Sequence, residues 1–101
     1  MIPFAEYEKQ NIRLCILRVL TEASNKTANQ SVIQIGLRSH SGVRASREEI
    51  VGYLDWLHQR GLVEREELST SVVMATLTAY GEDVARGFAT ATGVESPTKK
   101  G

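Results

Sequence analysis

The stretch RGLVEREELSTSVVMATLTAYG, residues 60–81, decides the fold of this chain. Gly61 permits the left-handed conformation that ends a helix, and the residues from Leu62 to Leu68 then begin an extended run. Ser69, Thr70 and Ser71 form a polar turn, and residues 72–78 are rich in β-branched side chains, with Val73, Ala75 and Leu77 on one side. The stretch therefore predicts a β-hairpin that directly follows a helix.

The residues on either side of the hairpin predict one helix before it and one after it. Ser46 is followed three residues later by Glu49, which is the pattern of a capping box, and it opens a run whose apolar side chains share one stripe. Thr78 can cap a last helix from Ala79 to about Ala89. The inward side chains of these two helices are Ile50, Tyr53, Leu54 and Leu57 in the first and Val84, Ala85 and Phe88 in the second.

Two further helices are expected nearer the N-terminus. Apolar residues recur at steps of three and four from Tyr7 to about Ala23, which predicts the most regular helix of the chain. Residues 24–28 are polar and turn-like, and Asn29 can cap a second, short helix that ends between Ser39 and Gly42. Residues 43–45 could add one short strand before the third helix.

The order of these elements predicts the fold class. Three helices followed by a two-stranded hairpin and a closing helix give a mainly α protein with a small β-hairpin (α+β), arranged as a winged helix-turn-helix. In that fold the third helix can enter the DNA major groove, and the hairpin lies against the backbone or the minor groove. We expect one winged-helix domain over residues 1–91 and a flexible C-terminal tail over residues 92–101.

The chain also resembles a known group of proteins. The residues that carry the resemblance are Asp55-Trp56-Leu57, Arg60 to Val63, Ala75 to Thr78 and Gly93-Val94, with Gly81, Asp83 to Ala85, Gly87 and Pro97. In these residues the chain resembles small proteins encoded in Mu-like phages and prophages. Gly-Leu-Val and Leu-Thr-x-x-Gly are shared with winged-helix regulators of the multiple-antibiotic-resistance and arsenical-repressor types. The resemblance implies a winged-helix fold and a DNA-binding protein, with transcriptional regulation as the finer expectation.

Composition excludes several other classes of protein. Twelve Lys and Arg balance twelve Asp and Glu, so no overall field attracts the protein to DNA or an acidic membrane, and DNA contacts must be local. One cysteine and two scattered histidines predict no metal site, and no motif predicts a cofactor or an enzyme. No apolar run could span a membrane and no signal peptide is visible. We expect the protein to act in the cytoplasm of a bacterial host.

The candidate DNA contacts lie at three places. Arg38, His40, Arg44 and Arg47 precede or open the third helix, and Ser46 with the first amides of that helix could hold a phosphate. Gln59 could donate to a base from the far end of the helix, and Ser69, Thr70 and Ser71 could contact the DNA backbone from the hairpin tip. Each of these residues also has a simpler interpretation, as a solvated surface group, a helix cap or an ordinary turn.

Two features favour an alternative function. The outer face of the third helix carries Glu48, Gly52, Asp55 and Gln59, so it is acidic and would meet repulsion from phosphate. Leu14 falls opposite the apolar stripe of the first helix and Leu17 lies at its margin, so the two could form a dimer or partner contact. The alternative is a protein–protein interaction module in phage gene control or DNA packaging, with a homodimer or another phage or host protein as its partner.

Overall fold

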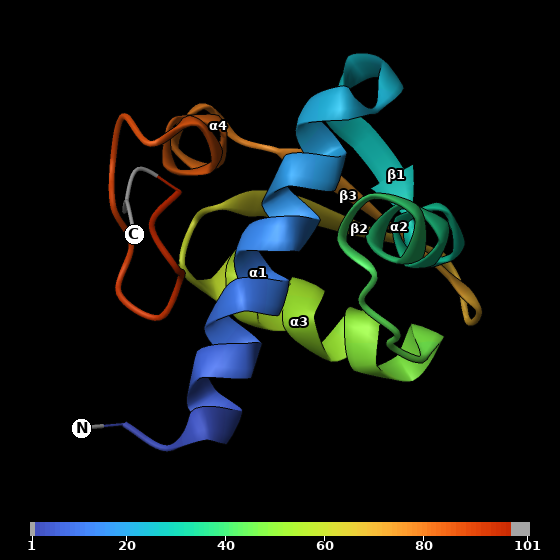
Figure 1. The fold of residues 1–101 in the computed structure, drawn as a ribbon. Coiled ribbons are helices and arrows are strands. Elements are labelled where there is room, and N and C mark those ends of the chain that lie inside the picture. Colours follow the sequence, from blue (N-terminus) through green and yellow to red (C-terminus); the bar gives the residue numbers. More distant parts are fainter. Residues whose placement is uncertain (1, 98–101) are drawn as a thin grey trace.

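The computed structural model describes residues 2–97 and contains helices packed on one antiparallel sheet (Figure 1). The helices are α1 (Phe4–Glu22), α2 (Gln30–Gly36), α3 (Arg47–Gln59) and α4 (Ala79–Arg86), with a 3-10 turn η1 (Ser24–Lys26) and a π-helical turn η2 (Leu37–Ser41). The strands β1 (Thr27–Asn29), β2 (Val63–Ser69) and β3 (Val72–Leu77) form a sheet in the order β1-β3-β2. The predicted fold class, a winged helix-turn-helix, is confirmed.

The helix starts follow the predicted side-chain caps. The Asn29 side chain accepts a hydrogen bond from the amide of Val32 (2.9 Å) at the start of α2. Ser46 and Glu49 form both halves of the capping box of α3, at 3.0 and 2.8 Å. The Thr78 hydroxyl accepts from the amide of Gly81 (2.9 Å), which opens α4. These bonds satisfy amides that have no partner within their own helix, so local sequence sets where α2, α3 and α4 begin.

The third strand differs from the prediction. Residues 43–45 do not form a strand, whereas Thr27–Asn29, which spans the end of the expected turn and the predicted cap Asn29, pairs antiparallel with β3 as β1. Thr27 lies opposite Thr76, and their hydroxyl oxygens are 2.9 Å apart. The strand forms because β3 offers a second edge to pair with, and this partner lies far away in the sequence.

The core is built around α1, which lies across the sheet in Figure 1. Leu14 is only 2% exposed and Leu17 is fully buried, so the prediction that they face a dimer partner is wrong. The helix packs against α4, η2 and β3, so side chains on more than one side of it are covered. A one-sided stripe therefore underestimates how much of α1 is buried.

The C-terminal end also departs from the prediction. Residues 92–97 are not a loose tail, because Val94 is buried and the amide of Glu95 donates to the carbonyl of Gln10 on α1 (3.2 Å). The rest of the predicted tail, residues 98–101, lies outside the described residues. Phe88 does not point inward but is 78% exposed, because α4 ends at Arg86 and Gly87 turns the chain with a positive φ of 86°.

Candidate nucleic-acid interface

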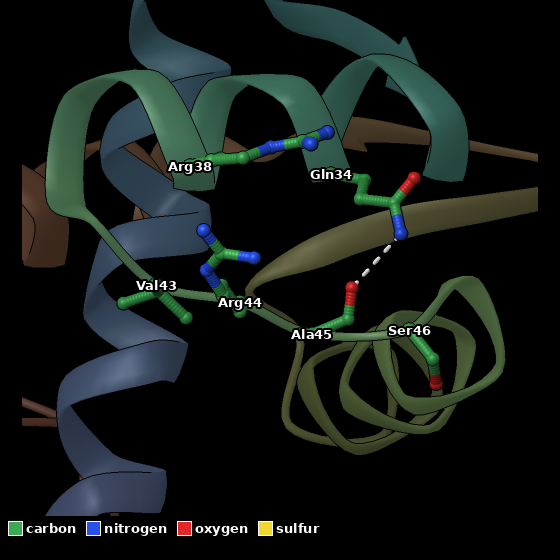
Figure 2. A pocket seen from close by; sticks show the side chains of 6 residues that line it. All are labelled: Gln34, Arg38, Val43, Arg44, Ala45 and Ser46. Atoms are coloured by element: carbon green, nitrogen blue, oxygen red, sulfur yellow. Dashed lines mark hydrogen bonds between the residues drawn. The ribbon is translucent and has the colours of Figure 1, made fainter.

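Two of the predicted arginines line a small pocket beside the start of α3 (Figure 2). Arg38 comes from η2, Arg44 from the loop between η2 and α3, and Ser46 from the N-cap of α3. The loop is held in place by the Gln34 side chain, whose Nε2 donates to the carbonyl of Ala45 at 2.9 Å. The cavity has a volume of about 280 Å³, and Val43 completes its lining.

This pocket carries positive charge that no ion pair within residues 2–97 neutralises. None of the ion pairs formed among residues 2–97 includes Arg38, Arg44 or Arg47. All three side chains are exposed. Arg47 is the first residue of α3 and does not itself line the pocket. Glu48 and Glu49 already occupy the first turn of α3, so the positive charge that favours an anion at this corner comes from the three arginines.

The outer face of α3 is less acidic than its sequence indicates. Ile50, Leu54 and Leu57 are buried, which leaves Glu48, Gly52 and Gln59 exposed on the opposite side of the helix. Asp55 is partly neutralised, because its Oδ1 lies 2.6 Å from Nε of Arg65 on β2. Sequence reasoning missed this pair, whose members lie on different elements on either side of the turn at Gly61.

The hairpin tip is fixed to α2 by a buried amide that sequence reasoning also missed. Gln30, at the start of α2, is 6% exposed. Its Nε2 donates to the carbonyl of Ser71 (2.7 Å), and its Oε1 accepts from the amide of Val73 (3.0 Å). The predicted contacts Ser69, Thr70 and Ser71 are exposed at this tip, so Gln30 determines where they lie relative to α2.

The far end of α3 is fixed by a stack of side chains around Trp56. The guanidinium carbons of Arg13 and Arg60 lie 3.9 and 3.8 Å from the centre of the Trp56 ring. Arg13 also donates to the carbonyl of Gly93 (2.9 Å) and to the Glu6 carboxylate (3.1 Å). The hydrogen bond from Arg13, followed by one from Gln10, lowers the pKa of Glu6 below its ordinary value of 4.5. Trp56 therefore packs within the domain. Gln59 is the predicted base contact at this end of α3.

The exposed apolar side chains of α1 are near its start, several residues before Leu14. Phe4 is 75% exposed and Tyr7 is 53% exposed. They border a groove of about 630 Å³, to which Ile12 of α1 and Val43 of the loop before α3 also contribute. Polar side chains line most of the rest of the groove, and Val43 and Arg44 line both this groove and the arginine pocket.

Comparison with known proteins identifies the relatives of this chain. It is 42% identical over 85 residues to protein gp26 of Escherichia phage Mu, and the match covers 84% of this chain and 85% of the phage protein. The chain belongs to the family of phage Mu gp26. A second relative, an uncharacterized protein of Haemophilus influenzae, is 39% identical over 75 residues, which cover 74% of this chain and 72% of that protein. The expected resemblance to proteins of Mu-like phages is thus confirmed, while no protein-family model matches the chain.

Solved structures of the winged-helix protein RosR have the same fold as this chain. The complex structure of hsRosR-S1 matches with a TM-score of 0.63 and 27% identity, over 77% of this chain and 67% of RosR. RosR of H. salinarum grown from NaBr matches with a TM-score of 0.64 and 28% identity, over 74% of this chain and 66% of RosR. Among residues 2–97, no helix has the length and apolar character that crossing a membrane requires.

Proposed function

We propose that this member of the gp26 family binds double-stranded DNA, and that a backbone phosphate occupies the pocket between Arg38 and Arg44. The observation that carries the proposal is the pair of arginines beside the N-terminus of α3, which have no acidic partner within residues 2–97. A guanidinium can donate two parallel hydrogen bonds to a phosphate, which makes two unpaired arginines a suitable phosphate site. The likeness of the fold to that of RosR supports the proposal.

The rest of the interface follows from the place of this pocket in the winged-helix fold. With the phosphate at the start of α3, this helix faces the major groove, and Arg47 and Gln59 are available as donors. The exposed tip at Ser69, Thr70 and Ser71 contacts the backbone as the wing. We infer a regulator of a Mu-like phage or prophage that acts in the cytoplasm of the host, by binding and not by catalysis. We also infer that it resembles regulators of the multiple-antibiotic-resistance and arsenical-repressor types in this mode of contact.

The experiment is a fluorescence-anisotropy titration of a mixed-sequence labelled duplex, repeated as the salt concentration rises. We expect binding that weakens steeply with salt, because each phosphate contact releases counterions. Changing Arg38→Ala and Arg44→Ala together should weaken binding at low salt. The slope of the logarithm of affinity against the logarithm of salt concentration should become shallower by about one for each phosphate that the variant no longer binds.

The matched control is Arg18→Ala, because Arg18 is exposed on α1 and, like the pocket arginines, takes part in none of the ion pairs among residues 2–97. If the control weakens DNA binding as much as Arg38→Ala or Arg44→Ala made singly, the pocket has no special role. If the unchanged protein does not bind at about 50 mM salt, where phosphate contacts are strong, the proposed function is wrong.

A second candidate function rests on the groove beside Phe4 and Tyr7. We propose that a second copy of the chain covers this groove, because a soluble protein gains free energy by burying large exposed aromatic side chains. Under the alternative that the protein is an interaction module with little DNA binding, the aromatic side chains of this groove would carry the function, and the partner would also cover Arg44. Light scattering after size-exclusion chromatography should show a dimer that Phe4→Ser with Tyr7→Ser converts to a monomer, and a monomeric unchanged protein would contradict it.

A further inference from the structure

Gly52 lies in the middle of α3 and has no structural explanation within the described chain. It is exposed, its φ is not positive, and a Cβ placed on it would have no heavy atom within 4 Å. A glycine in the interior of a helix destabilises it by roughly 1 kcal/mol relative to alanine. Nothing in residues 2–97 requires this glycine, and its position leaves the backbone of α3 open to a molecule that approaches from outside, beside a hollow that Lys9 and Arg13 of α1 also line.

Each of the other glycines in residues 2–97 has a structural reason within the domain. A Cβ on Gly36 would lie 2.7 Å from Cγ1 of Val19, and one on Gly81 would collide with the carbonyl of Leu62. The remaining ones adopt a positive φ, which only glycine tolerates without strain. These residues are Gly42, Gly61, Gly87 and Gly93.

Glu48 lies one helical turn before Gly52 on the same exposed face. It forms no hydrogen bond or ion pair with residues 2–97, in contrast to Asp55, which is paired with Arg65. An acidic side chain in the first turn stabilises a helix by about 0.3–1 kcal/mol, but this effect does not account for the glycine that follows. The face therefore presents one free carboxylate next to an open stretch of helix backbone.

We propose that Gly52 is where the backbone of α3 comes closest to the base pairs of the major groove, and that Glu48 accepts a hydrogen bond from the exocyclic amine of a cytosine. Among the base edges of the major groove, a carboxylate matches the amino group of cytosine, whereas arginine matches guanine. The inference rests on the proposed function, because a phosphate held by Arg38 and Arg44 at the same end of α3 sets how deeply the helix enters the groove. Arg44 and Arg47 offset the repulsion between Glu48 and nearby phosphates.

The test of Glu48 is selection of binding sites from randomised duplexes. The unchanged protein should select a cytosine at one position and prefer it by about tenfold over the other bases. Glu48→Gln should change that preference from cytosine to adenine, because an amide pairs with the adenine edge. The control Glu22→Gln makes the same chemical change on the exposed surface of α1 and should leave the selected sequence unaltered.

The test of Gly52 is a single variant whose effects on stability and on binding have opposite signs. Gly52→Ala should raise the Tm by about 4–8 °C, because alanine is the better helix former and meets no neighbour. The same variant should weaken binding to the selected duplex at least about tenfold and leave the salt dependence unchanged, because the phosphate contacts remain.

The outcomes separate this inference from the proposed function. If the unchanged protein binds DNA with no base preference, or if Glu48→Gln still selects cytosine, DNA binding stands and the role of Glu48 is wrong. If Gly52→Ala binds the selected duplex as tightly as the unchanged protein, the close approach at Gly52 is wrong. If no duplex binds at low salt, the proposed function and this inference both fail.

Discussion

The buried amide of Gln30 gives the most direct test of how the wing is held in place. Gln30→Ala removes two hydrogen bonds, one to the carbonyl of Ser71 at 2.7 Å and one from the amide of Val73 at 3.0 Å. Water can replace the first bond, because Ser71 is exposed, but Val73 is only 5% exposed and its amide loses its side-chain acceptor. The variant therefore separates a bond that solvent can replace from one that it cannot.

The magnitude follows from these two environments. A hydrogen bond that water can replace is worth about 1 kcal/mol, and a buried donor left without a partner costs about 1–3 kcal/mol. We therefore expect Gln30→Ala to lower the free energy of unfolding by about 3 kcal/mol. For a domain of this size, that corresponds to a fall in Tm of roughly 12–24 °C.

The assay is thermal and urea denaturation followed by circular dichroism, with hydrogen exchange at the amide of Val73. Gln34→Ala is the control, because it removes the same side-chain amide from a half-buried position on α2, where it makes one hydrogen bond, to the carbonyl of Ala45 (2.9 Å). The control should cost about 1 kcal/mol and leave exchange at Val73 unchanged. Equal losses for both variants, or an unchanged exchange rate at Val73 in Gln30→Ala, would refute the assignment of Gln30 as the anchor of the wing.

Three further predictions test other parts of the structure. Leu14→Ala should lower the free energy of unfolding by about 2–5 kcal/mol because the side chain is buried; a loss under about 0.5 kcal/mol in urea denaturation would be typical of an exposed leucine instead. Gly36→Ala should cost about 1–3 kcal/mol in the same assay, because its Cβ meets Val19, and Val19→Ala should recover part of that loss. The lowered pKa of Glu6 means that its bond with Arg13 stabilises the fold above pH 4.5 and is lost as the pH falls through the folded-state pKa. Glu6→Gln should therefore reduce the dependence of Tm on acid pH. A plot of Tm against pH that runs parallel to that of the unchanged protein would contradict this.

Local signals in the sequence predicted most of the fold, and long-range contacts account for the errors. The caps at Asn29, Ser46 and Thr78 depend on bonds to residues three positions ahead, so they are visible in the sequence. The strand β1 exists only because β3 pairs with it, and a three-residue segment has no periodicity of its own. The burial of Leu14 depends on α1 being covered on several sides, which its own apolar stripe does not reveal.

The candidate site was predictable as a set of residues but not as an arrangement. A cluster of arginines before a capped helix indicates a phosphate site, and the structure brings Arg38, Arg44 and Ser46 together around one pocket. The pairing of Asp55 with Arg65 changes the charge of the α3 face, yet it joins residues ten positions apart across a turn. Nothing in the sequence predicted that Gln30 anchors the hairpin tip, because a polar residue commonly follows an N-cap.

The stack around Trp56 makes this residue an intrinsic fluorescence probe of the fold. Trp56 is the only tryptophan in the sequence, and it lies where α1, α3 and the segment around Gly93 meet. Its fluorescence therefore depends on three parts of the chain that are distant in sequence, and detachment of the C-terminal segment alone should change the emission while the helices stay intact. Intrinsic fluorescence and circular dichroism recorded on one sample would then show whether that segment detaches before the domain unfolds, without any attached dye.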